Sequence, residues 1–269
     1  MRRYRWMVVG IVLTAGLPVA AMAAAKGIKI SERSDDFTLA PLGEGEADCG
    51  AKRAVSGGFF GEFDLATTAV IPLISTREGG SEWRFRAGDL GGGPSDATAY
   101  AYCAKKRKFP KLREGSEDDT TGAGITRVTA ECPGNRRVIS GGFEFPDTEV
   151  FVGTSMRSGR GSWTVEVFTG GTVPIEVFAY CAKGVKLKQR SSETTLPTED
   201  PDTEEARCKR KERVVSGGFD TESDGVMTAA VSSASQRSGK RSWEVTATAF
   251  GAPQPLSVYA YCLKQPKTK

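Results

Sequence analysis

The sequence contains no histidine, and this absence limits the chemistry that its side chains could perform. Without imidazole, neither a Ser-His-Asp nor a Cys-His nucleophilic site can form, and a zinc site would lack its commonest nitrogen ligand. Carboxylates are plentiful, but no two of them stand out as the acid and base of a glycosidase. The six cysteines are expected to pair, which removes a thiol nucleophile. We therefore predict a protein that is not an enzyme and that uses no cofactor or catalytic metal.

Acidic stretches are the one pattern that could hold a metal ion. The clearest is Asp220-x-Glu222-x-Asp224-Gly225, which places oxygen ligands at alternate positions like the start of a calcium loop. Val231 stands where the helix–loop–helix motif requires a bidentate glutamate. We favour a polar turn here, with calcium binding by Asp220, Glu222 and Asp224 as the alternative.

Arginine, tryptophan and tyrosine recur at fixed spacing and form a candidate ligand platform. Its members are Arg77, Trp83, Arg157, Trp163, Arg237, Trp243, Tyr102, Tyr180 and Tyr261. The arginines could stack on the tryptophans as cation–π pairs, and the tyrosines could stack on sugars. Because the same residue types occupy the same places in every copy, beside a pattern typical of a core strand, we favour a structural role.

These residues belong to a unit that occurs three times, which is the strongest pattern in the chain. Each copy runs from Ala-x-Cys through Ser-Gly-Gly-Phe and Trp to Ala-Tyr-Cys, and its tryptophan follows the previous one by 80 residues. We assign the first repeat to residues 26–105, the second to 106–183 and the third to 184–269. The segments between the core motifs are either first strands of an 80-residue unit or solvated linkers.

Within each copy the apolar residues alternate with a period of two, which predicts strands. Trp163, Val165 and Val167 share one face of a half-buried strand, preceded by the glycine-containing turn of a hairpin. The closing strand, around Ala179 and Tyr180, is apolar on both faces and should be central in its sheet. Two adjacent glycines after the serine indicate a bulge or a close backbone approach. The fold class is all-β.

Cysteine positions suggest one disulfide for each repeat. Six cysteines allow 15 pairings, and we choose those that join the first and last motifs of one copy. The predicted pairs are Cys49–Cys103, Cys132–Cys181 and Cys208–Cys262. Closing loops of this length stabilises a fold by about 4 kcal/mol in the chain-entropy model.

The N-terminus resembles a secretory signal peptide, which we place at residues 1–25. Arginines come first, an apolar run follows, and Ala21-Met22-Ala23 forms a cleavage site. The run is too short for a membrane anchor, so we expect no membrane span after cleavage. Loss of the three arginines of this segment lowers the net charge from +4 to +1, which removes bulk positive charge as an argument for nucleic-acid binding. We expect a secreted, extracellular protein without a lipid anchor.

The Cys…Ser-Gly-Gly-Phe…Trp…Ala-Tyr-Cys copies resemble repeats of secreted bacterial proteins without assigned activity. More distantly, Cys132-Pro-Gly-x-x-x-Val-x-x-Gly-Phe143, closed by Phe178-x-x-Cys181, resembles the repeat of the vitelline membrane outer layer protein I family. That resemblance implies three sheets arranged as a β-prism.

Two architectures and two functions follow as expectations. The first architecture is three tandem antiparallel β-sandwich-like modules with one disulfide each, and the alternative is a single β-prism with pseudo-threefold symmetry. The first function is a structural or adhesive role at or outside the cell surface. The alternative is a lectin-like protein with up to three equivalent glycan sites. A surface glycan or a protein is the expected partner.

Overall fold

A computed structural model describes residues 27–64, 68–89, 91, 94–146, 150–221 and 230–265, so the predicted signal segment lies outside the described residues. All regular elements of the described chain are strands, and the sheets pair them antiparallel, which confirms the predicted fold class. The described residues contain no helix that is long and apolar enough to cross a membrane.

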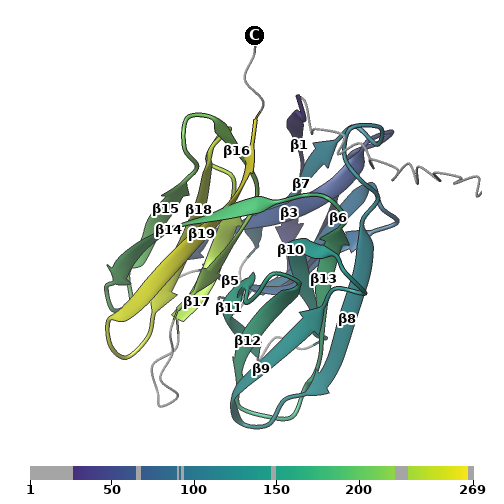
Figure 1. Ribbon diagram of the computed structural model, residues 1–269. Coiled ribbons are helices and arrows are strands. Elements are labelled where there is room, and N and C mark those ends of the chain that lie inside the picture. Colours follow the sequence, from purple (N-terminus) through teal and green to yellow (C-terminus); the bar gives the residue numbers. More distant parts are fainter. Residues whose placement is uncertain are drawn as a thin grey trace, which may run out of the picture.

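The strands form three sheets (Figure 1). In spatial order, the first sheet contains β1 (Ile30–Leu39), β7 (Ser95–Ala104), β3 (Arg53–Gly61), β17 (Ala230–Gln236), β18 (Ser242–Ala249) and β15 (Pro201–Arg207). The second contains β2 (Leu42–Asp48), β6 (Glu82–Asp89), β5 (Thr68–Glu78), β10 (Arg137–Glu144), β13 (Pro174–Ala182) and β8 (Arg113–Thr120), with β4 (Phe63–Asp64) paired to β5. The third contains β14 (Leu187–Leu196), β19 (Gln254–Lys264), β16 (Glu212–Asp220), β11 (Val150–Arg157), β12 (Ser162–Thr169) and β9 (Gly124–Glu131).

Every sheet combines strands from two repeats. The first sheet joins the first and third repeats, the second sheet joins the first and second, and the third sheet joins the second and third. The three modules are therefore interlocked by a cyclic exchange of strands, which neither the tandem-module prediction nor the prism alternative anticipated. The acid-rich segments between the core motifs supply β8, β9, β14 and β15, so the repeating unit is the full 80 residues and not a core with solvated linkers.

The Ser-Gly-Gly-Phe step is where neighbouring repeats meet. Its strand carries a register shift in each repeat, at Ala54/Ser56, Val138/Ser140 and Val214/Ser216. A Cβ atom on Gly142 would lie 2.3 Å from the Ser75 carbonyl oxygen of the preceding repeat. The sequence predicted a bulge or a close approach, and the structure contains both. Glycine is required because the backbones of two repeats lie in contact there.

The predicted strand faces are confirmed. Trp163, Val165 and Val167 are buried in the core between the sheets, and β13 lies between β10 and β8 as a central strand. All three predicted disulfides are present: Cys49–Cys103, Cys132–Cys181 and Cys208–Cys262. Disulfides of this kind persist in oxidising compartments, so the fold belongs to an oxidising environment.

Candidate binding site at the basic end

The aromatic rings of the candidate ligand platform do not face solvent, so the predicted stacking of sugars on them is wrong. The tryptophans Trp83, Trp163 and Trp243 are 2–3% exposed, and the tyrosines Tyr102, Tyr180 and Tyr261 are 0% exposed. A sugar can stack only on a ring face that solvent can reach, and these rings offer none. The reason is topological, because each tyrosine of one repeat packs under the hairpin of another.

The buried rings instead connect the repeats in a cycle. Tyr261 accepts a hydrogen bond from the Arg157 backbone N–H at 2.8 Å and packs edge-on against Trp163, with ring centroids 5.8 Å apart. The equivalent contacts join Tyr180 to Arg77 and Tyr102 to Arg237, also at 2.8 Å. Each tyrosine therefore satisfies a backbone donor of a different repeat, which favours a structural role for these rings.

Serine hydroxyls form a second cycle of contacts between the repeats. The Ser140 hydroxyl donates to the carbonyl oxygen of Val55 at 2.9 Å. In the same way Ser56 donates to Val215, and Ser216 donates to Ile139. The serine of each Ser-Gly-Gly-Phe step is thus buried and satisfied across a repeat boundary, so it is held in place and unavailable as a nucleophile.

Two arginines of the platform, Arg157 and Arg237, lie over tyrosine rings, whereas the sequence had suggested stacking on tryptophan. The Arg157 guanidinium lies 4.9 Å from the centre of the Tyr261 ring, and that of Arg237 lies 5.1 Å from Tyr102. Burial lowers the pKa of the Arg157 guanidinium, and the nearby Arg137 lowers this pKa further. A guanidinium stays protonated at neutral pH all the same. These arginines are therefore half-buried positive charges at the base of the hairpins.

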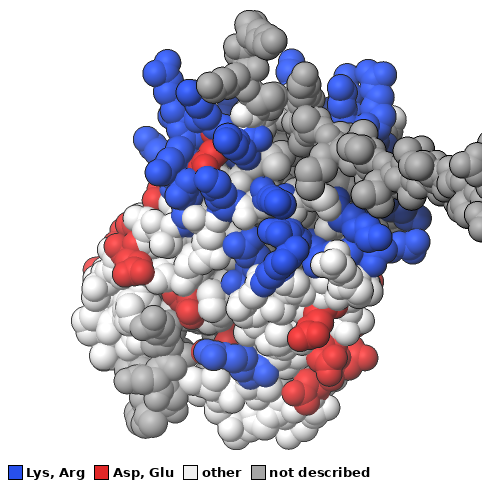
Figure 2. All heavy atoms as spheres, viewed as in Figure 1, with Lys and Arg blue, Asp and Glu red and all other residues white. Residues whose placement is uncertain are grey.

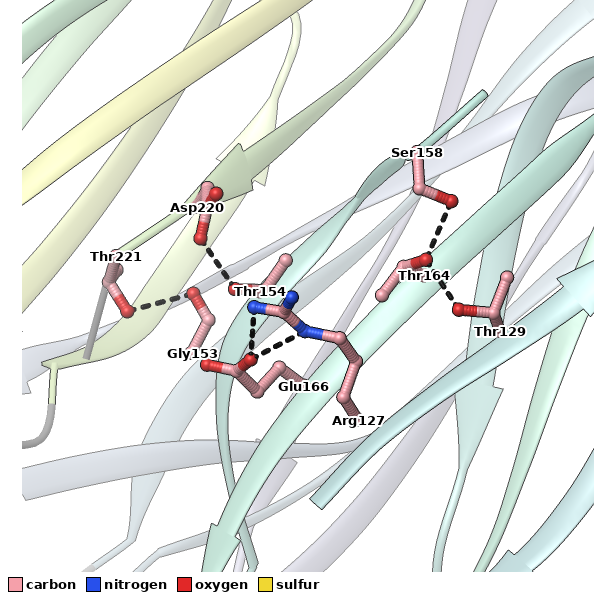
Figure 3. Close-up of polar contacts among 9 residues, drawn as sticks. All are labelled: Arg127, Thr129, Gly153, Thr154, Ser158, Thr164, Glu166, Asp220 and Thr221. Atoms are coloured by element: carbon pink, nitrogen blue, oxygen red, sulfur yellow. Dashed lines mark hydrogen bonds and ion pairs between the residues drawn. The ribbon is translucent and has the colours of Figure 1, made fainter. Parts of the chain in front are cut away.

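The acidic stretches serve as local hydrogen-bond acceptors where the structure describes them. Asp220 accepts a hydrogen bond from the Thr154 hydroxyl at 2.7 Å (Figure 3). Glu222 and Asp224, the other two predicted calcium ligands, lie outside the described residues. Within the part of the chain that is described, no three acidic, histidine or cysteine side chains gather closely enough to hold a metal ion.

The same surface of the third sheet carries an ion pair that its neighbours shield. Arg127 Nη2 lies 2.6 Å from Glu166 Oε2, and the Glu166 side chain is only 7% exposed (Figure 3). Two positions along the same strand, Thr164 contacts both Thr129 and Ser158 through hydroxyl hydrogen bonds. These contacts pair their members with one another across β9, β12 and the turn that follows β11, so they stabilise the sheet edge without offering a free reactive group.

An acidic groove lies on the second sheet, and the sequence did not predict it. It encloses about 610 Å³ between Asp118, Asp119, Glu144 and Glu176, with Arg86 at one side. Burial raises the pKa of Glu176, and the neighbouring negative charge of Asp118 raises this pKa further. Strand register brings these residues together, because Glu144 pairs with Glu176 and Glu176 pairs with Asp118. Residues this far apart in sequence become neighbours only once the strand pairing is known.

Lysine and arginine gather at one end of the molecule, whereas acidic residues lie toward the other (Figure 2). We call this region the basic end and define it by the turns and hairpins that meet there. Its members are Lys52, Arg53, Arg77, Lys105, Lys106, Arg107, Lys108, Arg136, Arg137, Arg157, Arg160, Lys209, Arg210, Lys211, Arg213, Arg237, Lys240 and Arg241. Backbone hydrogen bonds such as Val138 N–H to Arg160 and Val214 N–H to Lys240 hold turn and hairpin together in each repeat.

No ion pair in the described part of the chain engages these basic residues. The ion pairs among the described residues involve Arg84, Arg127, Arg190 and Arg207, none of which belongs to the basic end as defined. The net charge of +1 did not predict this region because it sums over both ends of the molecule. The signal was nevertheless present, since a basic turn precedes each Ser-Gly-Gly-Phe step.

One recess opens in the basic end. It encloses about 450 Å³ and is lined by Arg137, Arg157, Ser158, Gly159, Arg160, Leu187 and Gln189. Three arginines thus line a small space that also has the buried Leu187 in its wall. Guanidinium groups bind planar or tetrahedral oxyanions through paired N–H donors, so the recess has the chemistry of an anion site.

A scan against protein-family models finds no match to this chain, and a search of curated proteins also finds no matching protein. Functional inference for this protein therefore depends on the geometry and charge of its own residues.

Proposed function

We propose that this chain is an exported, non-catalytic protein with a structural or adhesive role at or outside the cell surface. The observation that carries this proposal is that the residues repeated three times are used to lock the repeats together. The tyrosines, serines and paired glycines all lie at repeat boundaries, where they make hydrogen bonds or close backbone contacts. Side chains engaged in this way are unavailable for chemistry, which supports a scaffold or binding protein and not an enzyme.

The predicted compartment agrees with this role. Three disulfides, one in each repeat, suit a protein that works in an oxidising environment outside the cytoplasm. The signal-like residues 1–25 support export, and a chain cleaved after them would begin just before β1.

Glycan binding is the second candidate function, and the basic end is the observation that favours it. Sugar stacking on Tyr102, Tyr180 and Tyr261 in three equivalent sites does not support it, because these three rings are buried. A cluster of unpaired lysine and arginine side chains attracts polyanions through its electrostatic field. An acidic surface glycan is therefore a better match than a neutral one.

Co-sedimentation with cell-surface material tests the proposed function. The purified chain from residue 26 onward would be mixed with isolated, glycan-bearing cell envelopes, and the fraction in the pellet measured. We expect most of the protein in the pellet, and no new product when the same protein is incubated with a panel of glycans. Reduced and unfolded protein serves as the control for non-specific sticking. Recovery of the native protein in the supernatant, or turnover of any glycan, would contradict the proposal.

A further inference from the structure

The three repeats form three equivalent arginine–tyrosine sites that differ at one strand position. In each site, the residue paired with the buried tyrosine comes from the first strand of a repeat. Gln189 on β14 pairs with Tyr261, whereas Glu32 on β1 pairs with Tyr102 and Glu114 on β8 pairs with Tyr180. Two sites therefore carry a carboxylate at this position, and the third carries a neutral amide.

This difference changes the electrostatics of the arginine in each site. Burial lowers the pKa of Arg237, and Glu32 partly reverses the effect of burial on this pKa. Burial also lowers the pKa of Arg77, and the negative charge of Glu114 partly offsets this decrease. Burial lowers the pKa of Arg157 as well, Tyr261 partly reverses this and Arg137 lowers the pKa further, so no carboxylate acts on this arginine. The positive charge at Arg157 is thus compensated least of the three.

The hairpin adds a third cation to the same site. Arg160 stands at the tip of the hairpin that begins at Arg157 and lines the recess with it. The same hairpin position is Lys240 in the third repeat and Gly80 in the first. Gln189 contributes its amide, whose oxygen accepts a hydrogen bond from Arg157 Nη2 at 3.4 Å. The amide group carries both a donor and an acceptor, so it can also bind sugar hydroxyls.

We propose that the recess of Arg137, Arg157, Arg160 and Gln189 is a binding site for an acidic sugar unit of a surface glycan. The recess volume of about 450 Å³ falls in the range of small-molecule sites, roughly 300–1,000 Å³. The guanidinium groups bind the carboxylate or sulfate of the sugar, and the Gln189 amide and the Leu187 wall contact the ring. This proposal rests on the proposed function in assigning the glycan to a cell surface, and it restricts glycan binding to one of the three equivalent sites.

Substitution Gln189→Glu tests the electrostatic basis directly. It places in this site the carboxylate that the other two sites already carry, so the variant is expected to fold normally. Isothermal titration would compare oligogalacturonate, which carries carboxylates, with a short dextran sulfate, and neutral dextran serves as the uncharged probe. We expect at least one of the two charged probes to bind the unsubstituted protein with a stoichiometry of one. The same probe should bind at least about tenfold more weakly to Gln189→Glu.

A matched control adds the same charge elsewhere on the same strand. Thr195 is an exposed residue of β14 on the same face as Gln189 but about 20 Å away along the strand. Thr195→Glu should therefore bind the probe within twofold of the unsubstituted protein. If both variants bind as tightly as the unsubstituted protein, or if both weaken binding equally, the recess is not the site.

A gain of function gives a second test that does not depend on loss of folding. Glu32→Gln removes the carboxylate from the site of Arg237, Arg213 and Lys240, which otherwise resembles the recess most closely. We expect this variant to bind two equivalents of the charged probe. Glu114→Gln should gain much less, because Gly80 leaves that site without a third cation. A stoichiometry of one in Glu32→Gln would overturn the role assigned to Gln189.

The two proposals fail in different ways. If Gln189→Glu loses the oligosaccharide but sediments with cell envelopes as before, the surface role stands and the recess is not the part that contacts the surface. If the unsubstituted protein binds oligosaccharide through the recess but stays in the supernatant, the recess is a site and the surface role is wrong. Binding of neutral dextran as strongly as either charged probe would overturn the assignment of an acidic sugar.

Discussion

Removing the Tyr261 hydroxyl tests whether the repeats stabilise one another. It is fully buried and accepts the Arg157 backbone N–H at 2.8 Å, from a different repeat. Tyr261→Phe leaves the ring against Trp163 but removes the acceptor, so the partly buried Arg157 backbone donor loses its partner. Such a loss costs about 1–3 kcal/mol. Because Arg157 is half-buried and water can reach part of the site, we expect a decrease of about 2 kcal/mol in the free energy of unfolding.

Urea denaturation followed by tryptophan fluorescence measures this change. Since the hydroxyl joins two interlocked repeats, the whole curve should move to lower urea as a single transition with an unchanged slope. Tyr100→Phe is the matched control, because Tyr100 is only half-buried, and it should change stability by less than about 0.5 kcal/mol. A change below about 0.5 kcal/mol in Tyr261→Phe, or two separate transitions, would refute the proposed coupling between repeats.

Three further predictions concern the interior. Burial raises the pKa of the three buried tyrosines, so ultraviolet titration should find them un-ionised until the fold is lost. Because only the unfolded chain releases these protons, their contribution to the free energy of unfolding is fully present below about pH 10. Above that pH the free energy of unfolding should fall by about 1.4 kcal/mol per pH unit for each tyrosine. Gly142→Ala should cost at least about 3 kcal/mol in urea denaturation, because its Cβ would lie 2.3 Å from the Ser75 carbonyl oxygen, whereas Gly170→Ala meets nothing within 4 Å and should be neutral. Replacing Cys132 and Cys181 with serine should cost about 4 kcal/mol for a sequence separation of 49, and an unchanged urea midpoint would contradict this.

Much of the fold could be predicted from the sequence because its signals are local. The period of two around Trp163 predicts the buried face of β12, and the two apolar faces around Tyr180 predict a central strand. The cysteine positions at the ends of each copy predict the disulfides. The exchange of strands between repeats could not be predicted in this way. Only two residue pairs join β5 to β10, and a repeat pattern does not say which neighbour an edge strand will meet.

The candidate site was harder to predict because it depends on contacts between repeats. Tyr261 and Arg157 are 104 residues apart, and nothing in the spacing shows that one would cover the other. The aromatic rings that could have faced solvent are therefore found buried. The basic end was missed for a different reason, since net charge reports a sum and contains no information about how opposite charges are separated in space.

The positions that join the repeats hold the same residue types in all three repeats, whereas other positions of the sheets differ between repeats. At the boundaries between repeats, the tyrosine, tryptophan, serine and paired-glycine positions hold the same residue types in all three repeats, and they make equivalent contacts there. Away from these contacts, one row of equivalent positions reads Asp118, Glu176 and Glu144 on the second sheet but Glu193, Ser257 and Asp220 on the third.

A cyclic set of contacts allows little variation, because a change in one repeat must fit two neighbours, whereas an outer residue has no such constraint. A function shared equally by three sites would require the outer residues to repeat as faithfully as the inner ones. They do not repeat, and the position of Gln189, Glu32 and Glu114 is the clearest example. Specific binding by this protein should therefore come from a single surface site on a symmetric frame, and measured stoichiometries should be one and not three.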